Sequence, residues 1–84
     1  MKEVKVYTTT YCPYCKRAKA LFESLGVDYE EIDVENNQEL RDQLIEKYQW
    51  QTVPLITIGE ELVGGFDDIS RLHGEGKLLE MVNA

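Results

Sequence analysis

Two cysteines, Cys12 and Cys15, stand three positions apart near the start of this chain of 84 residues. A disulfide across so short a loop removes little entropy from the unfolded chain, so it stabilises a fold only weakly. In a reducing compartment such a pair more often carries out redox chemistry or binds a metal. In disulfide exchange a thiolate attacks a disulfide, and a second thiol then releases the product. The pair therefore indicates thiol–disulfide exchange.

A metal site and a purely structural role are the alternatives for the two cysteines. The third candidate ligand in the chain is His73, its single histidine. Structural zinc usually takes four protein ligands, so a metal would need a second chain, and we expect none. A histidine near the C-terminus of a helix can interact favourably with the helix dipole. We expect this role for His73 and no catalytic one.

The two thiols are expected to have unequal roles. Cys12 lies at the predicted N-terminus of a helix over residues 13–25, where unpaired N–H groups and the macrodipole favour negative charge and lower a thiol pKa. Lys16 follows one turn later and adds to that field. Cys15 lies one turn inside the helix. We predict that Cys12 is the exposed nucleophile and Cys15 the shielded resolving thiol.

The net charge of −7 argues against nucleic acid as a partner, since phosphate binding needs a basic surface. Residues 1–22 nevertheless hold five of the nine Lys and Arg residues and one of the sixteen acids. This basic end contains the cysteines and favours thiolates and anionic thiol partners. No apolar run approaches the roughly 20 residues needed to span a bilayer, and residues 1–5 do not resemble a signal peptide. We expect a soluble, cytoplasmic, monomeric protein with a single domain over residues 1–84.

Hydrophobic periodicity predicts alternating elements along the chain. Strands are expected at residues 3–8, 28–34, 54–58 and around 62–63, and helices at 13–25, at 38–48 and from 67, the last interrupted near Gly74 and Gly76. The first half then forms a parallel, right-handed crossover and the second an antiparallel hairpin. The fold class is α/β, β-α-β-α-β-β-α, with a mixed four-stranded sheet flanked by helices. The predicted buried stripes of the first two helices are Tyr14, Ala18, Leu21, Phe22 and Leu25, then Leu40, Leu44, Ile45 and Tyr48.

Three motifs in this order resemble the glutaredoxins, which have the thioredoxin-like fold. They are Cys12-Pro13-Tyr14-Cys15, Thr52-Val53-Pro54 and Gly64-Gly65-Phe66-Asp67-Asp68. The resemblance implies a glutathione-dependent oxidoreductase that reduces protein disulfides and glutathione mixed disulfides. It also implies a cis peptide bond before Pro54, a Val53 backbone that pairs with glutathione, and an Asp68 carboxylate that meets the γ-glutamyl ammonium. The residues expected to bind glutathione are Tyr14, Thr52, Val53, Pro54, Gly65, Phe66, Asp67 and Asp68.

One position departs from the glutaredoxin pattern. Many members carry a lysine three residues before the first cysteine, and here that position is Thr9, with Lys16 or Arg17 as possible substitutes. Two alternatives therefore stay open: a glutaredoxin-like redoxin reduced by thioredoxin reductase, and an iron–sulfur carrier in which two chains and two glutathiones share a cluster. Gln49 and Gln51 are expected to be exposed loop residues rather than ligand contacts, and Trp50 is expected to pack over the helix at 38–48. The expected partners are glutathione and disulfide-bearing or glutathionylated proteins, without nucleic acid or membrane.

Overall fold

A computed structural model describes residues 2–9, 12–49 and 53–83 of the chain. Its elements follow one another as β1 (Val4–Thr8), α1 (Pro13–Ser24), β2 (Glu30–Asp33), α2 (Gln38–Tyr48), β3 (Leu55–Ile58), β4 (Glu61–Gly64), α3 (Phe66–Gly74) and α4 (Leu78–Asn83). The predicted order is confirmed, with one correction. The last helical segment is two helices, α3 and α4, because the chain turns between them through Gly76, whose φ is +73°.

The four strands form a single mixed sheet in the order β2-β1-β3-β4. Strand β1 runs parallel to β2 and antiparallel to β3, and β3 runs antiparallel to β4. The predicted parallel pairing in the first half and the antiparallel hairpin from β3 into β4 are therefore confirmed. Gly59 makes that turn with a φ of +64°.

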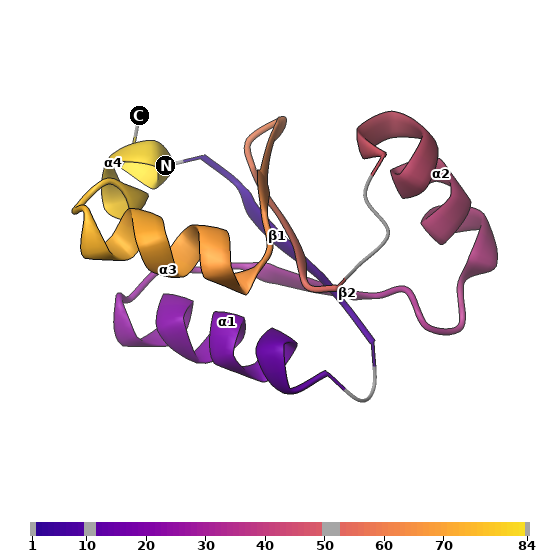
Figure 1. Ribbon diagram of the computed structural model, residues 1–84, viewed down its shortest axis with the longest axis horizontal. Helices are drawn as coiled ribbons and strands as arrows, with labels where there is room; N and C mark the ends of the chain where they lie inside the picture. Colours follow the sequence, from indigo (N-terminus) through magenta and orange to yellow (C-terminus); the bar gives the residue numbers. More distant parts are fainter. Residues whose placement is uncertain (1, 10–11, 50–52, 84) are drawn as a thin grey trace.

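The sheet separates two layers of helices (Figure 1). Helices α1, α3 and α4 cover one face, and α2 covers the other. Strand residues alternate accordingly: Val4 and Val6 belong to the cluster beneath α1 and α3, whereas Tyr7 packs with Leu44 of α2. The larger cluster includes Ala18, Phe22, Ile56, Ile58, Ile69, Leu78 and Val82. Since α1 packs in this cluster, its first turn, which carries the cysteines, is held against the sheet.

Local sequence explains where the helices begin and end. Pro13 is the first residue of α1, where a missing N–H costs nothing, and Gly26 follows its end with a φ of +69°. The Asn37 side chain accepts a hydrogen bond of 3.1 Å from the Leu40 N–H and so caps α2. No helix in the described residues is both long and apolar enough to cross a membrane.

Two predictions about burial are wrong. Tyr14 is 52% exposed and Ile45 is 37% exposed. Tyr14 stands in the first turn of α1 and lines an open groove beside the start of α3 instead of entering the core. Helical periodicity gives the direction of a side chain but not how far the opposing surface extends. The other stripe residues are buried or half-buried.

Candidate active site

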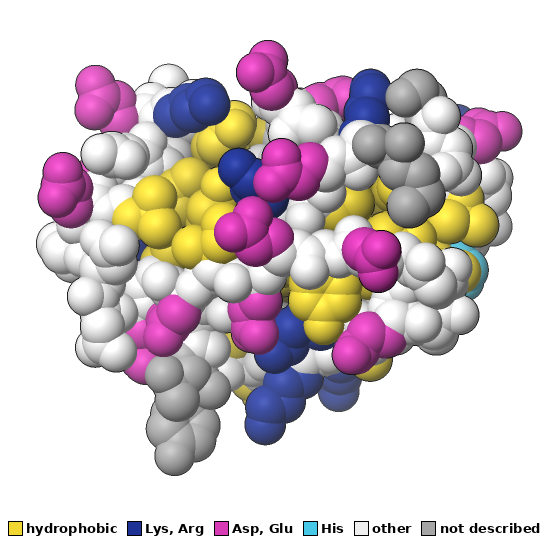
Figure 2. Space-filling view, turned by 180° about the vertical axis from the view of Figure 1, so that it is seen from behind, with side chains coloured by type: hydrophobic (Ala, Val, Ile, Leu, Met, Phe, Trp, Pro, Cys, Tyr) yellow, Lys and Arg dark blue, Asp and Glu magenta, His cyan; other side chains and the backbone are white. Residues whose placement is uncertain are grey.

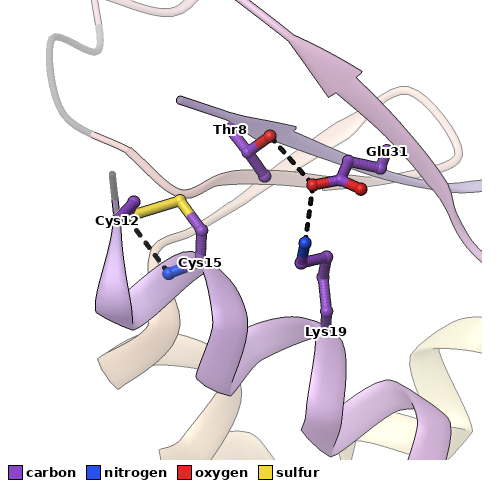
Figure 3. The surroundings of a disulfide bond; sticks show 5 residues. All are labelled: Thr8, Cys12, Cys15, Lys19 and Glu31. Atoms are coloured by element: carbon purple, nitrogen blue, oxygen red, sulfur yellow. Dashed lines mark hydrogen bonds and ion pairs between the residues drawn. A yellow bond between two sulfur atoms is a disulfide. The ribbon is translucent and has the colours of Figure 1, made fainter. Parts of the chain in front are cut away.

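The two cysteines form a disulfide at the start of α1 (Figure 3). Cys12 is the N-cap residue with an extended backbone, and its Sγ accepts a hydrogen bond of 3.1 Å from the Cys15 N–H. The sulfur thus occupies the place of the side-chain oxygen of an ordinary N-cap. A thiolate on Cys12 would accept the same donor and face the positive end of the helix dipole. The predicted placement of Cys12 is confirmed.

The prediction that Cys12 is exposed is wrong for the disulfide form, whereas Cys15 is shielded as predicted. In the disulfide form Cys12 is 8% exposed and Cys15 is 2% exposed, so neither side chain is exposed. The bridge holds Cys12 Sγ against the first helical turn instead of leaving it in solvent. Cys12 is still the more accessible of the two.

A groove with a volume of about 220 Å³ is formed by three separate segments of the chain. Tyr14 comes from α1, Val53 and Pro54 from the turn before β3, and residues 65–68 from the start of α3. The Val53–Pro54 peptide bond is cis, as the resemblance implied. Apart from Thr52, which lies outside the described residues, every residue predicted to bind glutathione lines this groove. They are Tyr14, Val53, Pro54, Gly65, Phe66, Asp67 and Asp68.

At the start of α3, the Asp68 carboxylate that lines the groove is held by several close contacts. The Gly65 N–H donates a 2.9 Å hydrogen bond to Asp68 Oδ2, while Asp68 Oδ1 lies 3.7 Å from an Arg71 nitrogen. Gly64 has a φ of +127°, and a Cβ there would overlap the Asp68 carboxylate. Glycine is therefore required at this position for two reasons, conformation and space. Asp67 is exposed in the same first turn of α3.

Two aromatic side chains, Tyr14 of α1 and Phe66 of α3, also line the groove. The Tyr14 ring lies 6.2 Å from the Phe66 ring between centroids, in a tilted arrangement that aromatic pairs favour. The Arg17 guanidinium lies 5.2 Å from the centroid of the same Tyr14 ring, within the range of a cation–π contact. These contacts fix the exposed Tyr14 side chain at the groove without burying it.

A second, polar cavity of about 290 Å³ touches both cysteines. Its lining includes Thr9 and Lys16 but not Arg17, together with Thr8, Lys19, Glu31 and Asp33. Of the two cations considered as substitutes for a lysine at position 9, Lys16 is therefore the one that faces the cavity of Cys12 and Cys15. Arg17 belongs to the Tyr14 side of the helix.

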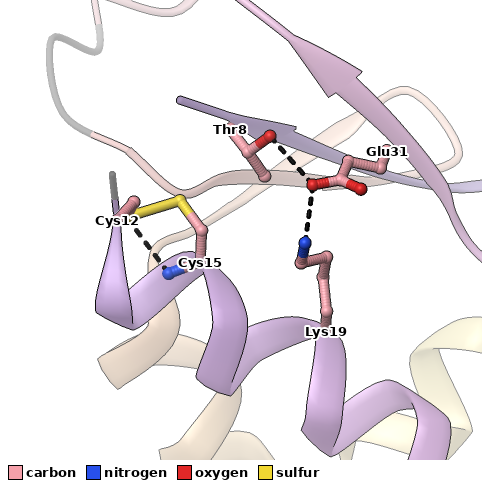
Figure 4. A network of polar contacts seen from close by, with 5 residues as sticks. All are labelled: Thr8, Cys12, Cys15, Lys19 and Glu31. Carbon is pink, nitrogen blue, oxygen red and sulfur yellow. Dashed lines mark hydrogen bonds and ion pairs between the residues drawn. A yellow bond between two sulfur atoms is a disulfide. The ribbon is translucent and has the colours of Figure 1, made fainter. Parts of the chain in front are cut away.

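Glu31 connects three elements in this cavity (Figure 4). Its Oε2 accepts hydrogen bonds of 2.7 Å from Lys19 Nζ on α1 and 3.2 Å from the Thr8 hydroxyl on β1. The hydrogen bond from Lys19 lowers the pKa of Glu31, and the same bond raises the pKa of Lys19. Sequence reasoning missed this network. The sequence does show that Cys15 and Lys19, four residues apart, lie on one helix face. It does not show the strand register that brings Glu31 to Lys19.

Several other residues of the sequence analysis lie away from both cavities. His73 is exposed in the last turn of α3, and Gln49 is exposed just after α2. Neither lines the groove or the polar cavity. Trp50 and Gln51 lie outside the described residues. In the described part of the chain, no three side chains of His, Cys, Asp or Glu are grouped as a metal site would require.

Comparison with known proteins decides the family. The family model described as Glutaredoxin matches residues 4–63, which include the cysteine pair and Pro54. A glutaredoxin of Pseudomonas aeruginosa is 48% identical over 84 residues, with all of both chains covered. The chain belongs to the glutaredoxin family. Glutaredoxin 3 of Escherichia coli K12 is 41% identical over 78 residues, covering 93% of this chain and 94% of the relative.

Solved glutaredoxins share the fold as well. A buckwheat glutaredoxin–glutathione complex superposes with a TM-score of 0.91 at 33% identity, covering 98% of this chain and 77% of that one. A glutaredoxin from Brucella melitensis gives 0.86 at 44% identity, covering 98% and 89%. This glutaredoxin is a glutathione-dependent thiol–disulfide oxidoreductase whose redox pair is Cys12 and Cys15.

Proposed function

We propose that glutathione lies in the groove between Tyr14 and Asp68, with its sulfur directed toward Cys12. The observation that carries this proposal is the convergence of three distant segments on one groove, to which α1 contributes Tyr14, a residue between the two cysteines in the sequence. Val53 is half-buried and precedes a proline, which favours an extended backbone, so its backbone groups suit the cysteinyl part of the ligand. The N–H groups of the first turn of α3 suit a carboxylate, and the Asp68 carboxylate suits an ammonium. The glutathione bound in the buckwheat complex supports this assignment.

Reduction of a glutathionylated protein then needs Cys12 alone. The Cys12 thiolate attacks the glutathione sulfur, a Cys12–glutathione disulfide forms, and the protein leaves as a thiolate that takes up a proton. The thiolate of a second glutathione attacks the bound glutathione sulfur. Glutathione disulfide leaves, and Cys12 returns as a thiolate held by the Cys15 N–H.

Reduction of a protein disulfide uses both thiols. Cys12 attacks one sulfur of the protein and releases the other as a thiolate. Cys15, deprotonated as it reacts, then attacks Cys12 Sγ, which releases the second protein thiolate and leaves the Cys12–Cys15 disulfide. Two glutathione molecules reduce this disulfide in turn, the first through a mixed disulfide with Cys12.

Four further expectations remain predictions: protein substrates of both kinds, a monomeric state, a single domain and a cytoplasmic location.

A coupled assay tests the proposed function. Glutathione, glutathione reductase and NADPH are supplied with a glutathionylated peptide, and NADPH oxidation is followed. We expect turnover that disappears in the Cys12→Ser variant. If the wild-type protein produces no turnover above the uncatalysed rate, the proposal is wrong.

A second electron donor is the alternative, and Thr9 is the residue that favours it. Thr9 lines the cysteine cavity at the position where many glutaredoxins carry a lysine. Thioredoxin reductase with NADPH, in the absence of glutathione, would then reduce the Cys12–Cys15 disulfide. Because Lys16 supplies a cation to the same cavity, we expect glutathione to be the faster reductant. A faster rate with thioredoxin reductase would reverse that order.

A further inference from the structure

The cations of α1 are not equivalent. Lys19 is paired with Glu31 at 2.7 Å. Lys16 and Arg17 are exposed, and among the described residues neither lies within ion-pair distance of a carboxylate. The first turn of α1 contains no acidic residue. Figure 2 shows one group of Lys and Arg side chains at the lower edge of the molecule, the side on which α1 lies, with acidic side chains above it and further Lys and Arg side chains toward the upper edge. A chain of net charge −7 thus presents a local positive surface beside its redox pair.

Arg17 is held in place without losing its donors. Its guanidinium lies over the Tyr14 ring at 5.2 Å, and a stacked guanidinium keeps its edge N–H groups available to a carboxylate. The Tyr14 ring is itself fixed by Phe66 and is 52% exposed. Tyrosine and arginine are the residue types enriched at the energetic centres of protein interfaces. An ordered, exposed Tyr–Arg pair is a preformed contact surface.

We propose that Arg17 and Tyr14, with Lys16 beside them, contact the substrate protein and select an acidic side chain next to its target cysteine. This inference rests on the proposed function and adds the substrate class. The start of α3 brings Asp67 and Asp68 to the same groove, and these carboxylates repel the acidic side chain. The cations of α1 and the carboxylates of α3 therefore also orient the substrate, with its acidic side toward α1.

Two glutathionylated peptides of identical sequence, except for Glu or Lys on either side of the cysteine, test this selection. They compete in one sample with glutathione as reductant, and the ratio of their kcat/KM values is measured. For the wild-type protein we expect about a threefold or larger preference for the Glu peptide at low salt, since one exposed ion pair contributes up to about fivefold. The preference should shrink as NaCl shortens the range of the interaction.

Substitutions at Arg17 test whether this side chain causes the preference for the Glu peptide. Arg17→Gln should reduce the preference, and Arg17→Glu should reverse it. Lys77→Gln removes an exposed positive charge away from both cavities and should leave the ratio unchanged. The ratio comes from one sample, so it does not depend on the fraction of folded protein.

Each outcome has one interpretation. Equal rates for the two peptides in the wild-type protein, or an unchanged ratio in Arg17→Gln, would overturn the inference while the proposed function stands. Failure to reduce either peptide would instead overturn the proposed function.

Discussion

Asp68 Oδ2 accepts a hydrogen bond of 2.9 Å from the Gly65 N–H, so a carboxylate that lines the groove also caps the helix that carries it. The same atoms must therefore serve both the stability of α3 and the proposed recognition of an ammonium. Two substitutions separate these roles, because asparagine keeps a side-chain oxygen for the cap and loses the charge, whereas alanine loses both.

Asp68→Asn should weaken glutathione binding with little loss of stability. Asp68→Ala should weaken binding to a similar degree and also lower the free energy of unfolding by about 1 kcal/mol, the usual cost of a lost cap. The KM for glutathione and urea unfolding of both variants measure the two effects. Equal stability of the two variants would show that the cap contributes nothing.

Gly64→Ala should destabilise the protein by about 1–3 kcal/mol, the range for a strained backbone residue. Its φ of +127° is unfavourable for alanine, and the new Cβ would displace the Asp68 carboxylate. The KM for glutathione should rise as well. Gly74→Ala is the matched control, because a Cβ at Gly74 meets nothing within 4 Å and α3 includes this residue. It should be neutral or stabilising by up to about 1 kcal/mol.

Cys15→Ser should separate the two proposed reactions. Reduction of a glutathionylated peptide should persist, since Cys12 alone exchanges with glutathione. Reduction of a protein disulfide should fall by more than about tenfold, because no resolving thiol attacks the mixed disulfide. Both substrates are assayed with the same glutathione-coupled system. A parallel loss of both activities would contradict the roles assigned to Cys12 and Cys15.

The Lys19–Glu31 pair should contribute a small, pH-dependent part of the stability. Because Lys19 lowers the pKa of Glu31 below its ordinary value of 4.5, the contribution is complete above that pH and is lost as the pH falls through the folded-state pKa. Glu31 is 44% exposed and Lys19 25% exposed, which limits the coupling to about 0.5 kcal/mol. Urea unfolding of Glu31→Gln, Lys19→Gln and the double variant measures this coupling.

The pH dependence has a second limit on the alkaline side. Glu31 raises the pKa of Lys19 above its ordinary value of 10.5, so the contribution is lost only as the pH rises through that higher value. We expect the measured coupling to be constant around pH 7 and absent near pH 3. Coupling of equal size at pH 3 would exclude an ionic origin.

The sequence by itself determined the redox pair and the order of the elements. These features depend on local patterns: a cysteine before Pro13 at a helix start, periods of hydrophobic residues, and glycines where the backbone turns. Nearly all the groove residues were indicated instead by the resemblance of three motifs to the glutaredoxins. The split into α3 and α4 was visible only as an interruption near Gly74 and Gly76, because local composition marks a break without giving its geometry.

Only the tertiary structure decided which of these residues meet. The convergence of Tyr14, Pro54 and Asp68 on one groove, and of Thr8, Lys19 and Glu31 behind the cysteines, depends on strand register and helix packing. Those are set by contacts between segments far apart in the chain. For the same reason Tyr14, which helical spacing places with the core, lies exposed at the groove with the Arg17 guanidinium over its ring.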